Sequence, residues 1–207
     1  MADLDLDRIT TAALAVADER GAAGFTMRAV ADALGVTPMA LYHHVEDKAA
    51  LVALVVDRVV GDVPIPAPTG SWREDLWQFA RWMREIAYSH PAVSELRRSH
   101  QVLTPKILPF TERWISVWQQ SGLPLEQAIR AAATSSMVLV GLVEEELLWA
   151  RMKPPDPSHL THLPSTRVSF ERKPDREADF ELVVRALLDG LHARLSAAVP
   201  AGASDNP

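Results

Sequence analysis

The clearest structural information in this chain lies in residues 26–48, which read TMRAVADALGVTPMALYHHVEDK. Thr26 can accept a hydrogen bond from the first turn of a helix that ends at Leu34 and is terminated by Gly35. Thr37 can cap the next helix, with Pro38 at its first position, where the missing N–H costs nothing. Two helices joined by a turn of about three residues that contains glycine have the spacing of a helix-turn-helix.

Two further helices flank this motif. The preceding one is predicted from about Asp5 to Arg20 and stops at Gly21. The short helix after Thr37 ends at His44, and Asp47 caps a fourth helix that runs from residue 48 to about residue 60. Four apolar positions are predicted to hold the two motif helices together: Leu34, Val36, Leu41 and Val45.

Apolar residues recur at helical spacing almost throughout, so the predicted fold class is all-α. Prolines and glycines divide the remainder into helices at about 71–89, 93–102, 109–121, 124–152 and 175–199, with a proline-containing loop at 153–175. We therefore expect four parts: a three-helix head at 1–47, a connecting helix at 48–63, a helical ligand-binding and dimerisation body at 71–199, and a flexible tail at 200–207.

The composition is that of a globular protein of 207 residues with a formal charge of −6 and no cysteine. The absence of cysteine excludes disulfide scaffolds, cysteine zinc sites and thiol nucleophiles, and it fits a reducing compartment. The start of the chain is acidic, unlike a signal peptide, and the longest uncharged apolar-rich run, residues 131–143, is shorter than the roughly 18 residues of a membrane span. We expect a cytoplasmic protein without membrane contact.

The helix after Gly35 has the side chains that a recognition helix needs. Such a helix places short side chains against base edges, while residues at its far end and on the following helix contact phosphates. A cation gains nothing from the dipole at a helix start, so Lys48 predicts a phosphate opposite it. The candidate base-facing residues are Thr37, Pro38, Met39, Ala40, Tyr42 and His43, and the candidate phosphate contacts are His44 and Lys48.

Residues 26–51 closely resemble the DNA-binding motif of the tetracycline repressor (TetR) family of bacterial transcription regulators. The match runs without a gap from Ala12 to Asp57 and includes the core Leu-Tyr-His-His-Val-Glu-Asp-Lys48. The resemblance implies a DNA-binding head of three helices, a connecting helix and a body that dimerises and binds a small inducer. It further implies these roles: base contact by Arg28, Pro38, Met39 and Ala40, phosphate contact by Thr26, Tyr42, His44 and Lys48, and operator preference at Met27, Ala40 and His43.

The charge of the head is unusual for a DNA-binding domain. Residues 1–60 contain five bases and nine acids, a net charge of −4, whereas such domains commonly carry a basic face. Most of these acids lie on the first predicted helix or away from the contact face, and few basic contacts predict a shallow salt dependence. The alternative is that Tyr42 and His44 only complete a small helical core.

Two helices are predicted to form a homodimer interface, those near 124–152 and 175–199. The first carries a single charge, Arg130, over residues 128–143, and so must be covered on most faces. The second has an apolar stripe of Val183, Val184, Leu187, Leu188, Leu191 and Leu195. A two-fold dimer would bind two half-sites one helical turn apart, in a palindrome of roughly 15 to 20 base pairs. Packing within one chain is the alternative use of both helices.

Aromatic residues and methionines of the body predict a concave apolar ligand site with a few polar groups, for a small hydrophobic or aromatic effector. Ordinary core packing is the alternative for any one of these residues. The candidate effector residues are Phe79, Trp82, Met83, His100, Thr104, Thr111, Trp114, Trp118, Ser136, Met137 and Val140.

The body also resembles the tetracycline-repressor type of C-terminal domain. In that subfamily a histidine at the position of His100 and an acid near Glu145 help to bind a drug-chelated magnesium ion. This chain has Phe79 where the resemblance places a drug-recognising asparagine, and Gly61 where it places a drug-binding histidine. We therefore expect a larger or more hydrophobic inducer than tetracycline, and no metal or other cofactor.

Other function classes find little support in the residues. His159 and His162 lie in a proline-containing loop without a nearby acid, and the run 144–146 of three glutamates points to successive helix faces. No nucleophile elbow, P-loop or dinucleotide motif is present, so an enzyme is not expected. The working hypothesis is a ligand-responsive repressor that binds a palindromic operator as a homodimer; the alternative is a helical adaptor that binds protein without DNA.

Overall fold

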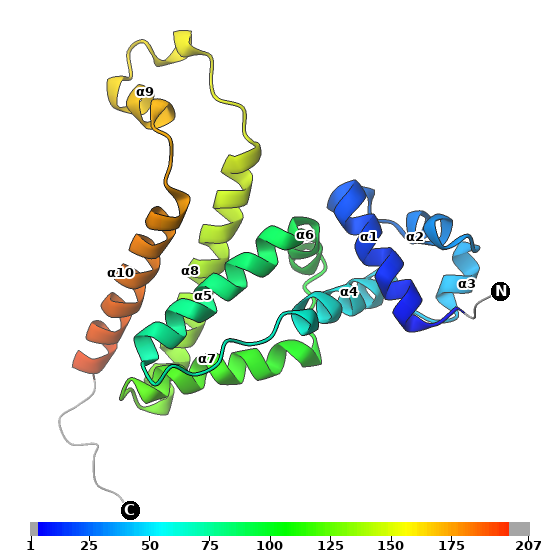
Figure 1. Ribbon diagram of the computed structural model, residues 1–207, viewed down its shortest axis with the longest axis horizontal. Coiled ribbons are helices and arrows are strands. Elements are labelled where there is room, and N and C mark those ends of the chain that lie inside the picture. The colour runs from blue at the N-terminus through cyan, green and yellow to red at the C-terminus, as the bar shows by residue number, and fades with distance from the viewer. Residues whose placement is uncertain (1–3, 199–207) are drawn as a thin grey trace, which may run out of the picture. The chain divides into compact units, whose positions relative to one another are not determined.

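The computed structural model describes residues 4–198, and over this range the chain forms ten α-helices, two short 3-10 helices and no strand (Figure 1). The all-α prediction is confirmed. No helix within these residues has the length and apolar character needed to cross a bilayer. The expected tail at 200–207 lies outside the described residues.

The head contains four helices: α1 (Leu6–Gly24), α2 (Met27–Leu34), α3 (Pro38–Tyr42) and α4 (Lys48–Asp62). Each begins with a side-chain cap, because Asp5, Thr26, Thr37 and Asp47 accept hydrogen bonds from main-chain N–H groups three residues later, at 2.8 to 3.3 Å. Gly35 ends α2 in the left-handed conformation, with φ 69° and ψ 30°. The caps predicted from sequence at residues 26, 37 and 47 are confirmed.

The predicted stop of the first helix at Gly21 is confirmed. The bounds of α1 extend to Gly24, but the backbone at Gly21 is not helical, with φ 69° and ψ 176°. The regular helical turns therefore end at Gly21. Phe25, which follows α1, is fully buried in the core of the head.

The core of the head extends beyond these four helices. Helix α6 (Pro91–Ser99) packs against both α1 and α4, and its Ala92, Val93 and Leu96 belong to the same buried cluster as the head. The short helix η1 (Pro105–Ile107) also contacts α4. The buried apolar side chains at the centre are Ile9, Val16, Phe25, Val30, Leu41, Leu51 and Val55.

The chain therefore divides into two units. The first takes in the chain up to Pro68 together with Arg81–Trp114, and the second takes in Thr69–Ala80 and the chain from Ile115 onward. This division differs from the boundaries at 47, 63 and 71 expected from sequence, because α6 and η1 return to the head after the linker.

The second unit is built around two long helices that lie side by side, α8 (Leu125–Arg151) and α10 (Arg176–Ala197) (Figure 1). Small residues of α8 allow close packing, and Phe180, Val184 and Leu188 of α10 are buried. Two further helices, α5 (Trp72–Ser89) and α7 (Leu108–Gln120), each contribute residues to both units.

Residues 153–175 do not form a simple loop as predicted. They contain η2 (Pro157–Leu160) and α9 (Pro164–Glu171), each with a proline in its first turn. Helix α9 has no buried residue, and its Phe170 ring lies 6.1 Å from that of Trp149. The helix was missed because an exposed segment of eight residues has no apolar periodicity to indicate it.

Candidate nucleic-acid interface and effector region

Helix α3 is anchored on one side and open on the other. Leu41 and Val45 are buried in the head, and Leu34 and Val36 are half-buried against it, as expected for residues that hold α2 and α3 together. The opposite side chains lie in solvent: Met39 is 67% exposed and Tyr42 is 49% exposed. His43 and His44 are exposed as well, so Tyr42 and His44 do not complete a core.

Lys48 is the first residue of α4, and its ammonium Nζ lies 5.7 Å from the centroid of the Phe25 ring. This contact gives the cation a partner at a helix end where the dipole offers it none. Phe25 is fully buried, so the contact places the Lys48 ammonium beside the core of the head.

The other predicted interface residues surround this group. Arg28 is exposed on α2, with its Nε 4.0 Å from Asp32, a separation at the limit of an ion pair. Thr26 and Thr37 are exposed and use their side chains as caps, and Pro38 is exposed. Met27 and Ala40 are half-buried, so they present less surface than the rest of the set.

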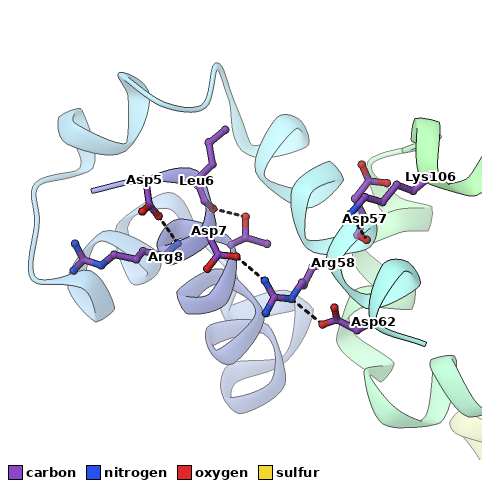
Figure 2. A network of polar contacts seen from close by, with 9 residues as sticks. Asp5, Leu6, Asp7, Arg8, Asp57, Arg58, Asp62 and Lys106 are labelled. Atoms are coloured by element: carbon purple, nitrogen blue, oxygen red, sulfur yellow. Dashed lines mark hydrogen bonds and ion pairs between the residues drawn. The ribbon is translucent and has the colours of Figure 1, made fainter. Parts of the chain in front are cut away.

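Polar contacts connect α4 to the elements on either side of it. Figure 2 shows the Arg58 side chain between Asp7 of α1 and Asp62 of α4, at 2.7 Å and 2.8 Å. The hydrogen bonds to Asp62 and then Asp7 raise the pKa of Arg58 above its usual value. Lys106 of η1 donates to the carbonyl of Asp57 at 3.4 Å. Helix α4 is thus attached both to α1 and to η1.

The predicted effector residues belong to both units. Those in the first unit are Trp82, Met83, His100, Thr104, Thr111 and Trp114, and those in the second are Phe79, Trp118, Ser136, Met137 and Val140. The four predicted tryptophans and phenylalanines are buried, and Thr104 is buried with them. Met83, His100, Ser136 and Val140 are half-buried.

Two members of this set lie on open surface. Thr111 is exposed, with its hydroxyl 3.4 Å from the carbonyl of Ile107 on the preceding turn. Met137 is 72% exposed on α8. The single chain encloses neither, because both side chains project from the outer faces of their helices.

Trp118 and His100 have defined polar partners. Trp118 is fully buried and donates its indole N–H to Ser135 at 3.3 Å, so it forms part of the core of the second unit. The His100 Nδ1 lies 3.0 Å from the carbonyl of Leu96 and therefore donates to it. Within residues 4–198 no group of three His, Asp or Glu side chains is arranged to hold a metal ion.

The predicted apolar stripe of α10 divides between two environments. Val184 and Leu188 are buried within the chain, whereas Val183 is exposed together with Leu182, which was not predicted. Leu187, Leu191 and Leu195 are half-buried. The stripe was assigned too uniformly, because periodicity does not show which part of it a neighbouring helix of the same chain covers. Exposed apolar side chains remain on both long helices: Ile129, Met137, Val138, Leu182 and Val183.

Sequence reasoning missed contacts between residues far apart in the chain. Phe110 of α7 stacks on Trp82 of α5, with centroids 4.4 Å apart and an interplanar angle of 16°. Arg58 and Asp7 are 51 positions apart. No local pattern indicates either pair, because each depends on how separate helices pack.

Two family models match this chain. The model of bacterial regulatory proteins of the tetR family matches residues 9–55, and that of the tetracyclin repressor-like C-terminal domain matches residues 64–195. The chain belongs to the TetR family. It is therefore a transcriptional regulator with a helix-turn-helix head, and the family is one of regulatory proteins, not of enzymes.

Individual relatives agree with the assignment to the TetR family. An HTH-type transcriptional regulator of Saccharopolyspora erythraea is 30% identical over 70% of this chain and 62% of its own length. The HTH-type transcriptional repressor DrrR1 of Streptomyces coeruleorubidus is 32% identical over 70% of this chain and 54% of its own. In each case the match covers less than two thirds of the relative's own length.

A solved structure covers nearly the whole chain. The TetR-family protein ActR of Streptomyces coelicolor, crystallised in complex with (S)-DNPA, is 26% identical and superposes with a TM-score of 0.74. The alignment covers 94% of this chain and 100% of the ActR chain.

Proposed function

We propose that this TetR-family regulator binds a palindromic DNA operator as a homodimer, represses transcription there, and is released by a small hydrophobic or aromatic effector. The observation that carries the proposal is the exposure of α3. A helix in a well-packed head keeps Met39 and Tyr42 in solvent, where they would contribute little to folding but are available to a partner.

The side chains around α3 suit a duplex. Short residues at its N-terminus, Pro38 and Met39, can approach base edges in the major groove, with Arg28 of α2 beside them. Tyr42 and His44 at its far end, and Lys48 on the next helix, can contact phosphates. Phosphate contacts would set the position of the helix, and the base-facing side chains would determine sequence preference.

Dimerisation is supported by the exposed apolar side chains of α8 and α10. Large exposed residues such as Met137 and Leu182 are costly in water, and a second copy related by a two-fold axis would cover them. Such a dimer presents two α3 helices, and we expect half-sites about 34–36 Å apart in a palindrome of roughly 15 to 20 base pairs.

Release by an effector requires that ligand binding move the heads. Helix α4 is attached to α1 through Arg58 and to η1 through Lys106, so a displacement of η1 would move α4 together with α1. An effector that prefers the displaced state by typically 1 to 3 kcal/mol would change operator affinity roughly 5- to 150-fold. ActR was crystallised with a small molecule, and DrrR1 is named a repressor.

The test is a gel-shift titration of the purified full-length chain on the promoter region of its own gene, with a scrambled duplex as competitor. We expect palindrome-dependent retardation at a stoichiometry of two chains per duplex. Tyr42→Ala is expected to lower affinity about tenfold or more, and Tyr42→Phe to lower it less. Arg20, an exposed base elsewhere on the head, provides the control. Arg20→Ala is expected to bind the operator with the same affinity as the parent.

The adaptor alternative gives a different result. A helical protein-binding module would show no palindrome-dependent retardation, and Tyr42→Ala would not alter its behaviour toward DNA. Selection of bound sequences from a random duplex library would then return no two-fold symmetric motif.

A further inference from the structure

Two adjacent histidines follow the exposed helix of the head. His43 is the C-terminal cap of α3, and the main-chain N–H of His44 donates to the carbonyl of Leu41 at 2.9 Å. Both side chains are exposed, and within residues 4–198 neither imidazole makes a hydrogen bond, ion pair or ring contact. The backbone at these two positions therefore serves the fold, while both rings are available to a partner in solvent.

The segment that contains the histidines carries little charge, and its sign depends on them. Residues 26–48 contain two bases and three acids, so the net charge is −1 with neutral histidines and +1 with both protonated. The other charged or titratable groups are Arg28 and Asp32 on α2, which packs against α3, Tyr42 on α3, Glu46 and Asp47 in the following turn, and Lys48 at the start of α4. Histidine changes its charge between about pH 5 and 8, so the segment changes sign within that range.

The acids around the histidines are engaged with other groups or exposed to water. Asp32 lies 4.0 Å from the arginine of its own helix, and Asp47 accepts a hydrogen bond from a main-chain N–H of α4 at 2.8 Å. At the start of α1, Asp5 is a helix cap and Asp7 pairs with α4. Glu46 is exposed. No acid in the described part of the chain is paired with either imidazole, so a counter-charge would come from outside the chain.

A DNA phosphate is such a counter-charge. An anion within a few ångströms favours the protonated form of an imidazole, and the protonated ring donates from both nitrogens, whereas the neutral ring donates from one. Arg28 and Lys48 are the bases of residues 26–48. Because permanent positive charges are so few here, each added charge raises the attraction to a duplex by a large fraction.

We propose that operator binding by this regulator is coupled to proton uptake by His43 and His44, so that the operator is bound more tightly as the pH falls from about 8 to about 6. The proposal rests on the proposed function, because it concerns the same face of α3. The sign follows from linkage: the complex binds more protons than the free protein and duplex, so a lower pH favours the complex. A dimer brings four such histidines to the duplex. If each protonated ring favours the complex about threefold, affinity rises about 100-fold at full protonation.

The test measures the affinity of the full-length protein for DNA from about pH 6 to about pH 8 at constant salt. The probe is the labelled promoter duplex that the protein retards in the gel-shift titration, and affinity is measured by fluorescence anisotropy. We expect about 10- to 100-fold tighter binding at the lower pH. Calorimetry at about pH 7 in two buffers of different ionisation enthalpy should show uptake of about one proton per dimer.

The salt dependence gives a second measurement on the same protein and probe. At about pH 8 histidine is neutral, so the permanent bases alone set the slope of log K against log salt. At about pH 6 the protonated rings add to them, and the slope should be steeper.

Substitution identifies the groups that take up the protons. His43→Gln together with His44→Gln keeps both positions neutral, and this double variant should show no gain in affinity at lower pH. His43→Lys together with His44→Lys keeps both positive and should also be insensitive to pH. His159→Gln with His162→Gln is the matched control, because it removes two exposed histidines of the second unit and should retain the full pH dependence.

His90 requires a control of its own. Its Nδ1 lies 3.0 Å from the Asp18 carboxylate, a contact between α1 and the N-terminus of α6 within the first unit. Protonation of His90 would strengthen a contact inside the protein and not a contact with DNA. His90→Gln should therefore leave the pH dependence of operator affinity unchanged. Circular dichroism and urea unfolding at both ends of the pH range show whether each variant is folded.

Equal affinity at both ends of the pH range, no proton uptake in calorimetry, or a pH dependence that survives in the double glutamine variant would each overturn the inference. Loss of the pH dependence in His90→Gln or in the matched control would do the same. Failure of the proposed function is distinguishable. Absence of retardation at every pH contradicts DNA binding and the inference with it, whereas retardation that does not vary with pH contradicts only the coupling to protons.

Discussion

Replacing Lys48 by alanine should make operator binding much less sensitive to salt. Arg58 is engaged by Asp7 and Asp62, so it is not available to phosphates, and Lys48 and Arg28 are the bases on the open face around α3. Lys48 at a phosphate and Arg28 in the major groove bring two positive charges per chain, or four per dimer, to the duplex. Counted as one displaced counterion site each, they predict a slope of log K against log salt of about −3.6. Lys48→Ala removes half of them, and the slope should fall to about −1.8.

The assay is fluorescence anisotropy of a labelled operator duplex at several salt concentrations. Between about 50 and 200 mM salt these slopes correspond to a loss of about 150-fold in affinity for the parent and about 12-fold for Lys48→Ala. Arg20→Ala is the matched control, because it removes the same charge from an exposed position of α1. Its slope should equal that of the parent.

The same substitution has a small effect on folding. Lys48 loses its contact with the Phe25 ring, which is worth about 0.5–1 kcal/mol at a partly exposed site. Urea unfolding should therefore show a nearly unchanged midpoint, so that weaker DNA binding does not reflect unfolding. A slope that is the same for Lys48→Ala and the parent, or lowered equally by Arg20→Ala, would refute the assignment of Lys48 to a phosphate.

Three further predictions concern the scaffold. Gly35→Ala should lower the free energy of unfolding, measured by urea denaturation, by about 1–2 kcal/mol. The cost comes from the backbone, because φ is 69° at Gly35 while an added Cβ would meet no atom within 4 Å. An unchanged free energy of unfolding would show that the left-handed cap is not required. Ser135→Ala should cost about 1–3 kcal/mol, measured in the same way, because the buried indole N–H of Trp118 loses its acceptor, and a neutral result would mean that another acceptor replaces it. Hydrogen bonds from Ser158 lower the pKa of Asp156 below its reference value of 3.8. The ionised Asp156 therefore stabilises η2 fully above pH 3.8, and this stability is lost as the pH falls through the lower pKa of the folded state. Amide exchange at Ser158 should accelerate as the pH falls through that pKa in the parent but not in Asp156→Asn.

Much of the head could be predicted because its determinants are local. A cap joins a side chain to an N–H three residues later, as at Thr26, Thr37 and Asp47, and such a bond can be inferred from residue type and spacing alone. Gly35 likewise indicates a left-handed backbone at the end of α2, because glycine adopts a positive φ without steric cost. The exposed face of α3 followed from the same spacing, since Leu41 had to face inward and Tyr42 then had to face out.

The candidate effector region was less accessible to this reasoning. The sequence indicated that Trp82 and Thr104 could line a site, but it did not single out Phe110 or Arg113. The ring of Trp82 on α5 stacks on Phe110, and the Nε of Arg113 is buried without a hydrogen-bond partner among the described residues. Both are properties of the surroundings, which residue type and periodicity do not specify.

The amino-acid sequence by itself determined the all-α class, the order and approximate ends of most helices, and the helix-turn-helix, because all of these depend on interactions closed within about four residues. Only the tertiary structure decided that α6 and η1 join the head and that Arg58 pairs with Asp7. It also decided that Val184 and Leu188 of the α10 stripe are buried while Val183 stays exposed. These depend on the rotation and crossing of helices distant in sequence, which are set by the packing of many side chains at once.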